Sequence, residues 1–287
     1  MSIAKALGLG VVGAVLALSL APQDATAQSE WETVRIATEG AYAPWNFSNP
    51  DGTLDGFEIE LARDLCERME VTCEIVQQDW AGIIPALQAG QYDAIMAGMN
   101  ITDQREEVIS FSRSYAGTPH GFAAMAGSPL LELETADAPL SLDDDPDQVA
   151  ATIEAWKPIL EGKVIGVQGS TTNSNFLREY LDDVIEIREY GSTEQHDLDL
   201  TAGRLDGIFA AHSALKATQQ KPEFADMQIV GTGMRGGILG RGVAVGVRQG
   251  DEDLAAMFSA AIDEAMADGT AAELAVKWFG VDVTPAE

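Results

Sequence analysis

The sequence has few basic residues and very few cysteines and histidines. Lys and Arg number 17 against 46 Asp and Glu, which gives a formal net charge of −29. A field of that sign repels phosphates, so it argues against nucleic acid or an anionic membrane surface as a partner. The acidity indicates solubility or a salty habitat and does not identify a ligand. The histidines, His120, His196 and His212, are far apart in sequence, so we predict no metal site and no cofactor.

The rest of the composition is ordinary. Hydrophobic residues make up 46% of the 287 residues and charged residues 22%, values that exclude a disordered or collagen-like chain. A chain of this length contains one large domain or two lobes.

Only one long apolar run occurs, and it lies at the amino terminus. It extends from Ala6 to Pro22, follows Lys5 and precedes the small-residue site Ala25-Thr26-Ala27. This order is typical of a secretory signal peptide, so we expect residues 1–27 to be cleaved off before Gln28. The alternative is an uncleaved anchor, although the run is short for a membrane span of about 20 residues.

The two cysteines, Cys66 and Cys73, belong to an exported chain, for which a disulfide is the favoured state. On one continuous helix their Cα atoms would be about 10 Å apart, whereas a disulfide needs less than about 7 Å. We therefore predict a disulfide and a helix that ends between the two cysteines, near Glu70-Val71-Thr72. Two free buried thiols are the alternative.

Segments with strand and helix patterns alternate along the chain, as in a parallel sheet covered by helices. The predicted strands are Val34–Thr38, Cys73–Gln77, Tyr92–Ala97 and Val164–Val167. The predicted helices begin at Phe57 and Ile83, and others cover Val149–Leu160, Glu252–Asp268 and Ala271–Phe279.

One stretch occurs twice. Residues 89–97, AGQYDAIMA, resemble residues 202–210, AGRLDGIFA, and each reads as a helix end, a glycine and a buried strand. The strand at Val164 is likewise similar to the one at Val34. The repetition indicates that one lobe was built twice; coincidence between two generic strand–helix units is the alternative.

Ligands of open parallel sheets bind beyond the carboxyl ends of the strands. This rule selects Thr38–Tyr42, Ala97–Arg105, Gln168–Asn173 and Ala210–His212. Arg105 after the turn Gly98–Thr102 could clamp a carboxylate, because guanidinium offers a planar bidentate fork. A surface salt bridge of Arg105 with Glu106 or Glu107 is equally compatible with the sequence.

The other segments carry further candidates. The hydroxyl-rich turn Gly169–Asn173 opens a helix and could hold an anion, or it could be an ordinary helix cap. Glu39 could pair with a cation or be solvated. The aromatic residues Tyr42, Trp45 and Trp80 could form cleft walls or belong to the core. His212 could line the cleft or lie on the surface.

These same residues carry a resemblance to the periplasmic solute-binding proteins for polar amino acids that supply ABC importers, and within them to the octopine- and nopaline-binding group. The similar segments cover nearly the whole mature chain. They are Ile36–Trp45, Leu54–Ala62, Asp79–Leu87, Tyr92–Met96, Ile101–Arg105 and Ala267–Thr270.

The resemblance implies a two-lobed α/β periplasmic-binding-protein fold of type II, with two parallel-rich sheets, helices on both faces and two crossover hinge strands. Residues 28–117 and 242–287 would form one lobe and residues 118–241 the other. It also implies periplasmic localisation, a membrane permease as a transient partner and a monomeric state.

The resemblance further implies residue roles. Arg105 matches the arginine that grips the α-carboxylate of the ligand, and Glu39 matches the acid that reads the distal cation. The remaining ligand-binding candidates are Tyr42, Trp45, Trp80, Ala97, Gly98, Asn100, Gln168, Thr171, Thr172, Asn173, Ala211 and His212. The spacing of Cys66 and Cys73 matches the disulfide of the basic amino-acid binders.

The sequence departs from the family pattern at Ala211, where typical members have an aspartate that holds the α-ammonium group. Losing that partner would cost a free amino acid about 1.5–3 kcal/mol. A secondary α-nitrogen with a bulky substituent, as in an opine, fits the small residue better. We therefore predict a binding protein for an octopine- or nopaline-type opine, or for arginine.

The rival predictions are a cyclohexadienyl dehydratase on the same fold, with Glu39 or His212 as general acid, and a receptor domain, which the lack of a second apolar run disfavours.

Overall fold

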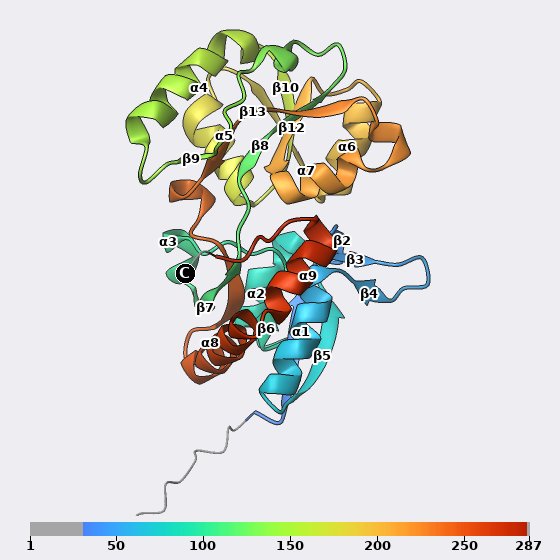
Figure 1. Ribbon diagram of the computed structural model, residues 1–287, viewed down its shortest axis with the longest axis vertical. Coiled ribbons are helices and arrows are strands. Elements are labelled where there is room, and N and C mark those ends of the chain that lie inside the picture. Colours follow the sequence, from blue (N-terminus) through green and yellow to red (C-terminus); the bar gives the residue numbers. More distant parts are fainter. Residues whose placement is uncertain (1–30, 286–287) are drawn as a thin grey trace, which may run out of the picture. The chain divides into compact units, whose positions relative to one another are not determined.

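The computed structural model describes residues 31–285, and the predicted signal peptide lies outside the described residues. Within this part of the chain, two mixed sheets are each covered by helices on both faces (Figure 1). No helix of residues 31–285 is both long and apolar enough to cross a membrane.

The first sheet has the strand order β5-β1-β6-β14-β7. Strands β5 (Thr72–Gln77), β1 (Thr33–Thr38) and β6 (Ala94–Ile95) are parallel, whereas β14 (Val243–Arg248) is antiparallel to β6 and to β7 (Ile109–Ala116). The sheet is thus parallel in only one half, because β7 and β14 are the strands through which the chain leaves and re-enters it.

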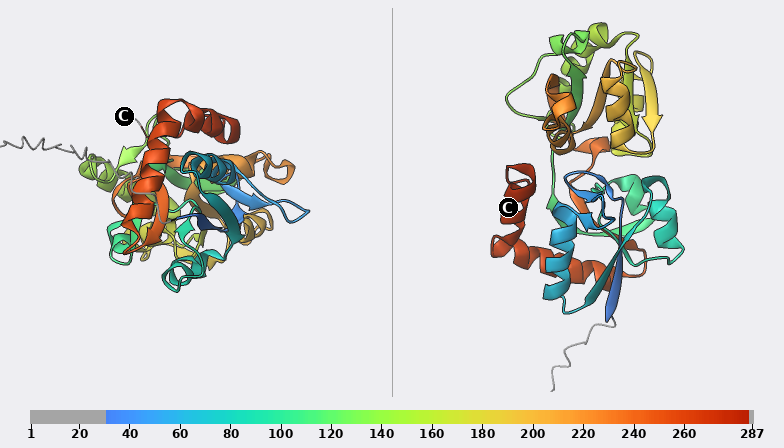
Figure 2. Two further views of the ribbon diagram at one scale, coloured as in Figure 1. Left: turned by 90° about the horizontal axis from the view of Figure 1, so that it is seen from below. Right: turned by 90° about the vertical axis from the view of Figure 1, so that its right-hand side faces the viewer.

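Helices cover the two faces of the first sheet. One core contains residues of α1 (Phe57–Arg68), α8 (Glu252–Ala267) and α9 (Thr270–Phe279), which lie together in Figure 2. The other core contains residues of α2 (Ile83–Gln88) and of η1 (Trp80–Gly82). The short helix α3 (Asp103–Glu106) precedes β7.

The second sheet has the order β11-β10-β12-β8-β13-β9. Strands β11 (Glu186–Tyr190), β10 (Val164–Gln168) and β12 (Gly207–Ala211) are parallel, β8 (His120–Met125) is antiparallel to β12 and β13 (Met227–Arg235), and β9 (Leu140–Ser141) is parallel to β13.

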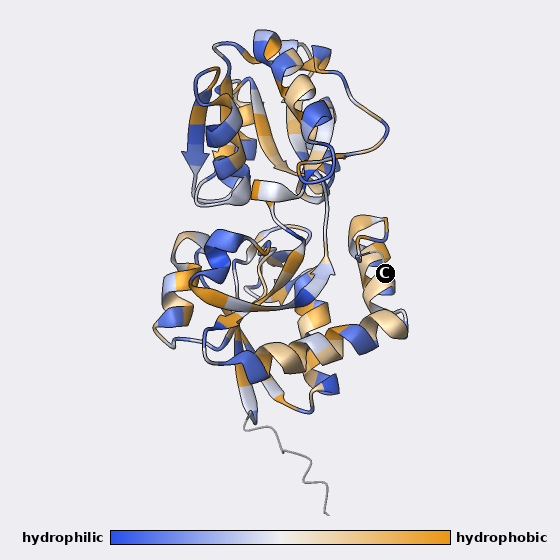
Figure 3. Cartoon of the chain, turned by 90° about the vertical axis from the view of Figure 1, so that its left-hand side faces the viewer, coloured by the Kyte–Doolittle hydropathy of each residue, from blue (hydrophilic) through white to orange (hydrophobic). Residues whose placement is uncertain are grey.

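Helices also cover both faces of the second sheet. Helices α4 (Pro146–Leu160) and α5 (Thr172–Leu181) contribute to one core, while α6 (Thr193–Thr201), α7 (His212–Gln219) and η3 (Pro222–Phe224) contribute to the other. The short helices η2 (Pro129–Glu132) and η4 (Gly237–Leu239) adjoin the first of these cores. Apolar residues are concentrated in the central strands, and polar residues on the outer faces of the helices (Figure 3).

A small antiparallel sheet of β2 (Ala41–Tyr42), β3 (Asn46–Ser48) and β4 (Leu54–Asp55) follows β1. The chain passes from the first sheet to the second between β7 and β8 and returns between β13 and β14. The predicted lobe boundaries, 117/118 and 241/242, fall in these two connections, and they stay a prediction.

The predicted repeat has the same structure twice. Strand β6 pairs with β1 through Ile36 and Ala94, and β12 pairs with β10 through Ile165 and Gly207, which is the position equivalent to Ala94. In each copy the following strand of the sheet, β5 or β11, lies on the other side of the first one. The likeness therefore extends from sequence to strand order and register.

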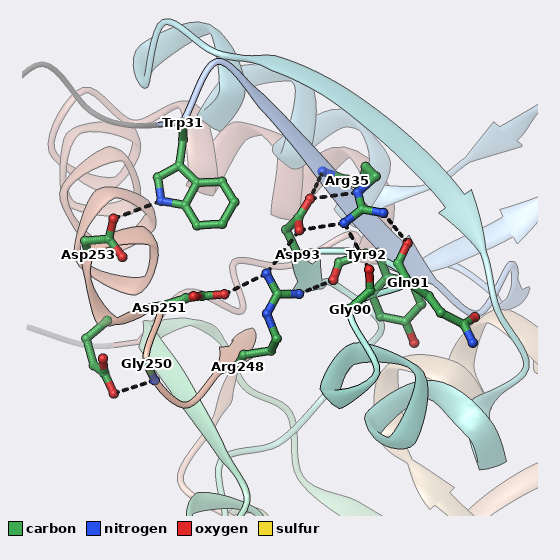
Figure 4. A network of polar contacts seen from close by, with 11 residues as sticks. Trp31, Arg35, Gly90, Gln91, Tyr92, Asp93, Arg248, Gly250, Asp251 and Asp253 are labelled. Carbon is green, nitrogen blue, oxygen red and sulfur yellow. Dashed lines mark hydrogen bonds and ion pairs between the residues drawn. The ribbon is translucent and has the colours of Figure 1, made fainter.

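An aspartate has the same task in both copies. The carboxylate of Asp93 accepts a hydrogen bond from the backbone N–H of Arg35, at 3.0 Å, and that of Asp206 accepts one from Val164, at 2.8 Å. Asp93 also forms ion pairs with the side chains of Arg35 and Arg248, at 2.9 and 3.1 Å, and so ties β1 to β14 (Figure 4). These ion pairs hold the pKa of Asp93 below its usual value, although burial acts in the opposite direction.

The predicted disulfide is confirmed. Cys66 and Cys73 are bonded, with Cα atoms 6.1 Å apart. Helix α1 ends at Arg68 and β5 begins at Thr72, as the spacing required. Glu70, which lies between them, has a φ of 56°. The disulfide therefore joins the last turn of α1 to the edge strand of the first sheet.

Candidate functional site

A cavity lies where strands of both sheets end. It contains about 440 Å³ of empty space, part of it open to solvent. Its lining includes most of the predicted residues: Glu39, Tyr42, Trp80, Ala97, Gly98, Asn100, Arg105, Gln168, Thr171, Thr172 and Asn173. The segments after β1, β6 and β10 thus meet as the strand-end rule predicts, whereas β12 contributes Phe209 and Ala210 from within the strand.

Arg105 supplies the positive charge of the cavity. It lies in α3, where the hydroxyl of Thr102 accepts a hydrogen bond from its backbone N–H at 3.2 Å. The guanidinium donates to the carbonyl of Asn100 at 2.7 Å and lies 5.3 Å from the ring centroid of Trp80. Burial lowers the pKa of Arg105 to about 10, so the group stays charged at neutral pH.

No carboxylate of the described residues forms an ion pair with Arg105. The surface salt bridge that the sequence allowed is not formed, because Glu106 pairs with Arg241 instead. The cavity therefore offers a partly buried cation that lacks an anionic partner from residues 31–285.

Glu39 supplies the negative charge. It follows β1, is only 4% exposed and accepts a hydrogen bond from the side-chain amide of Gln168 at 2.6 Å. Burial raises the pKa of Glu39 to about 7, against the effect of that hydrogen bond, and the nearby charge of Glu58 raises it further. No Lys, Arg or His forms an ion pair with Glu39 in the described part of the chain.

Two aromatic rings form walls of the cavity. Trp80 donates its indole N–H to the carbonyl of Ser170 at 3.0 Å, which fixes the ring. The ring of Tyr42 lies against Gly98, where a Cβ atom would stand 2.6 Å from the Tyr42 Cε1 atom. Gly98 is therefore needed for close approach of the ring, and its φ of 62° also favours glycine.

Residues of the hydroxyl-rich turn before α5 line the cavity on the side of the second sheet. Thr171 caps α5, because its hydroxyl accepts a hydrogen bond from the N–H of Ser174 at 3.1 Å. Thr171 thus acts as an ordinary helix cap, which was one of the two alternatives for this turn. Its neighbours Thr172 and Asn173 also line the cavity. Asn173 Oδ1 lies 2.7 Å from the Nδ1 atom of His120.

Three predicted residues are not part of the cavity lining: Trp45, Ala211 and His212. Trp45 is 1% exposed and belongs to the core, with its indole N–H donating to the Ser213 hydroxyl at 2.9 Å. The ring of His212 packs on Gly121 and Gly233, whose hypothetical Cβ atoms would lie 2.5 and 3.0 Å from it.

The structure adds residues that the sequence did not reveal as site residues. They are His120, Thr193, His196 and Phe209, while Ala210, which also lines the cavity, belongs to a segment that the strand-end rule selected. Thr193 follows the parallel strand β11, so the strand-end rule would have found it had that strand been predicted. His120 opens β8, an antiparallel strand to which the rule does not apply.

His120 is a neutral side chain in this site. Burial lowers its pKa to about 4, although the contact with Asn173 acts in the opposite direction. It pairs across β8 and β12 with Ala211, so both side chains lie on the same face of the sheet. No cluster of potential metal ligands occurs within residues 31–285.

Comparison with known proteins agrees with this geometry. Residues 34–281 match the model of bacterial extracellular solute-binding proteins, family 3. The chain belongs to this family. The members of family 3 that it resembles include the octopine-binding periplasmic protein of Rhizobium meliloti, 43% identical over 90% of this chain and 94% of that protein.

Two further similarities lie within the same family. The L-arginine-binding protein of Pseudomonas aeruginosa is 35% identical over 87% of this chain and 89% of that protein. A solved periplasmic His/Glu/Gln/Arg/opine family-binding protein from Silicibacter pomeroyi, in complex with lysine, has a TM-score of 0.71 and 32% identity, and the match covers 88% of this chain and 100% of that one. This chain is thus an α/β solute-binding protein of family 3, and these relatives are named as binding proteins.

Proposed function

We propose that this solute-binding protein takes an octopine- or nopaline-type opine, or else arginine, for delivery to an ABC importer. One observation carries the proposal: the cavity contains Arg105 without an anionic partner and the buried Glu39 without a cationic one among the described residues. A ligand with a carboxylate at one end and a guanidinium at the other would satisfy both charges. Unpaired charges in a partly buried site are costly, so such a ligand would bind tightly.

The cavity walls suit the middle of such a ligand. The α-carboxylate would lie on Arg105 with its aromatic neighbour Trp80 behind it. The alkyl chain would pass between Trp80 and Tyr42, and the distal cation would meet Glu39 in place of the amide of Gln168. Aromatic faces are good partners for both an alkyl chain and a guanidinium.

The choice of an opine over a free amino acid rests on Ala211. Ala211 does not itself line the cavity, but it pairs across the sheet with His120, which does, and its methyl group offers no charge to an α-ammonium. The neutral ring of His120, whose Nδ1 is engaged by Asn173, would accept a hydrogen bond through its other nitrogen from the protonated secondary amine of an opine, which has two N–H groups rather than three. One weak acceptor would suit the substituted nitrogen of an opine better than a primary ammonium group.

Ligand capture would proceed by closure of two lobes, hinged at the connections β7–β8 and β13–β14. Within residues 31–285, four hydrogen bonds already join segments that belong to the different sheets. Their donors are Trp45, Trp80, Gln168 and Thr193. The closed form would be the one that a membrane permease recognises, and the mature protein would be periplasmic, monomeric and without catalytic activity.

A thermal-shift panel tests the proposal directly. The mature protein is mixed with octopine, nopaline, arginine, ornithine, histidine, glutamine and glutamate. A ligand at 100 times its Kd stabilises the folded state by about 2.7 kcal/mol, which shifts the melting temperature by several degrees. We expect the largest shifts from the opines. A shift with arginine or ornithine alone would refute the argument from Ala211, and no shift at all would refute the ligand class.

The alternative, a cyclohexadienyl dehydratase, would need a general acid in the cavity. Glu39 is the candidate for this role, because its raised pKa keeps part of the carboxyl protonated near neutral pH. We expect no turnover of prephenate or arogenate. Measurable turnover that is abolished by E39Q would favour the enzyme over the binding protein.

A further inference from the structure

Beneath the cavity lie two polar side chains that are completely buried, Asn46 and Glu58. Asn46 begins β3, and Glu58 lies in the first turn of α1, where the helix dipole favours a negative charge. Neither residue is part of the cavity lining. A buried amide and a buried carboxylate are costly unless each is fully hydrogen-bonded, so their partners indicate what they do.

The two side chains form a chain of hydrogen bonds between two turns. The backbone N–H of Gly40 donates to Asn46 Oδ1, and Asn46 Nδ2 donates to Glu58 Oε2, both at 2.7 Å. The backbone N–H of Gly98 donates to Glu58 Oε1, also at 2.7 Å. The hydroxyl of Tyr115 is a further donor to the same oxygen. Burial raises the pKa of Glu58, but the side chain accepts from three donors, and this is the pattern that an ionised carboxylate satisfies.

Both turns carry ligand-binding candidates. Gly40 follows Glu39 directly, and Gly98 lies in the cavity wall against Tyr42. Both glycines have positive φ angles, 71° and 62°, so neither N–H belongs to a regular strand or helix. A single acceptor holds each of these N–H groups in the described structure, Asn46 for Gly40 and Glu58 for Gly98.

We propose that Asn46 and Glu58 are positioning residues, which set the turns of Gly40 and Gly98 at a fixed separation and thereby fix Glu39 and Tyr42 for the ligand. The pair touches no ligand and acts only through the two turns. The proposal rests on the proposed function for its ligands, but the geometry of the turns is measurable without any ligand.

The polarity of the pair makes an isosteric substitution informative. In E58Q one carboxylate oxygen becomes an NH₂ group. If that group faces Asn46, two donors meet, and turning Asn46 by half a turn only moves the conflict to the N–H of Gly40. If it faces Gly98 instead, that N–H loses its acceptor. Every arrangement leaves one N–H without a partner.

The double substitution N46D/E58Q reverses the polarity and restores every bond. The new amide at position 58 would accept from Gly98 and Tyr115 through its carbonyl oxygen, and its NH₂ group would donate to the new carboxylate at position 46. That carboxylate would in turn accept from the N–H of Gly40. The charge and the volume of the pair are unchanged. A purely steric account of E58Q predicts no such recovery.

Two measurements test the proposal: Kd for octopine and arginine by calorimetry, and amide hydrogen exchange of Gly40 and Gly98 in ligand-free protein. We expect E58Q to weaken binding at least about tenfold and to speed exchange at one of the two glycines, and N46D/E58Q to return both to wild-type values. Y115F is the control. It removes one buried hydrogen bond to Glu58 without touching either turn, so it should lower the melting temperature while Kd stays unchanged.

Other outcomes are equally decisive. E58Q with a lower melting temperature but wild-type Kd and exchange would show a merely structural role and overturn the proposal. If E58Q does not fold, the double variant must still fold and bind as the wild type does, and its failure overturns the proposal. If wild-type protein binds neither ligand, the proposed function fails, and hydrogen exchange in E58Q and in the double variant alone decides on the positioning role.

Discussion

The buried carboxyl of Glu39 makes a quantitative prediction about pH. Its pKa in the ligand-free protein is raised to about 7, chiefly by burial, so the group is largely protonated at pH 6. A cationic ligand group placed against it favours the ionised form. Binding must therefore release a proton below pH 7, and the affinity for a guanidinium ligand must fall as the pH falls.

The magnitude follows from linkage. With a free-state pKa of about 7 and a much lower value in the complex, binding is weakened by about 30-fold at pH 5.5 relative to pH 8, and about 0.9 proton is released at pH 6. His120, His212 and Arg105 do not titrate in this window, since the pKa values of the two histidines are lowered to about 4 and that of Arg105 to about 10, whereas burial also raises the pKa of the neighbouring Glu58.

Isothermal titration of octopine or arginine, in buffers with different ionisation enthalpies, measures both the affinity and the number of protons. The matched control is E39Q, which should bind more weakly and lose the pH dependence between pH 5.5 and 8. An affinity that is constant over this range in wild-type protein, or a proton taken up rather than released, would refute the assignment of the ligand cation to Glu39.

The same raised pKa affects the folded state without ligand. An acid with a folded-state pKa above its unfolded value destabilises the protein as the pH rises, here between about 4.5 and 7. The loss amounts to about 3 kcal/mol, because each pKa unit corresponds to about 1.4 kcal/mol. Wild-type protein should therefore lose stability relative to E39Q on going from pH 4.5 to pH 8. Parallel denaturant titrations of the two proteins measure the difference, and a constant difference would show that Glu39 is not protonated in the free cavity.

Further substitutions make separate predictions. Replacing Arg105 by Ala should weaken binding by at least about 100-fold with little change in the melting temperature of the free protein, since the guanidinium bonds only to one carbonyl among the described residues; undiminished affinity in calorimetry would contradict the clamp. A211D should strengthen the binding of free arginine about tenfold and weaken that of octopine, and a competition assay with both ligands checks the reversal. Replacing both Cys66 and Cys73 by Ser should lower the free energy of unfolding by about 2 kcal/mol, as expected for a short loop, and denaturant titration measures the loss. D93N should destabilise the protein at pH 7, and the difference should disappear as the pH falls through the lowered pKa of Asp93.

The elements that the sequence predicted well are those with a strong local pattern. The helix that begins at Phe57 and the strand Thr72–Gln77 follow from spacing and from the cysteine geometry. The edge strand Glu186–Tyr190 was missed because it is charged and has no fully buried residue, so it lacks the apolar period that predicts a strand. Thr193, which follows it, was missed for the same reason.

The candidates that do not line the cavity are explained by contacts between distant residues. Trp45 is a core residue because Phe57 and Phe279 surround it, with ring centroids at 5.8 and 4.8 Å. His212 turns away from the cavity because Gly121 leaves space for its ring. No local pattern reports such neighbours. Arg105 does line the cavity, but its lack of a salt bridge within the described residues could not be predicted from the sequence either. Its neighbour Glu106 forms an ion pair with Arg241, which lies more than a hundred residues away in the chain.

The duplicated architecture explains why a two-sided site arises at this place. The register that aligns Ile36 with Ile165 also aligns Glu39 with Gln168, so the residues after the first strand of each copy are equivalent. These two equivalent side chains contact each other across the cavity, at 2.6 Å. Each copy by itself contributes the strand ends on only one side of the cavity. A ligand can be enclosed only when the strand ends of both copies face each other. Because the first copy has a carboxyl at this position and the second an amide, Glu39 is the one acidic residue in the lining of the cavity among the described residues. A ligand that presents a cation to Glu39 and a carboxylate to Arg105, rather than a symmetrical one, therefore fits the proposed function of this cavity.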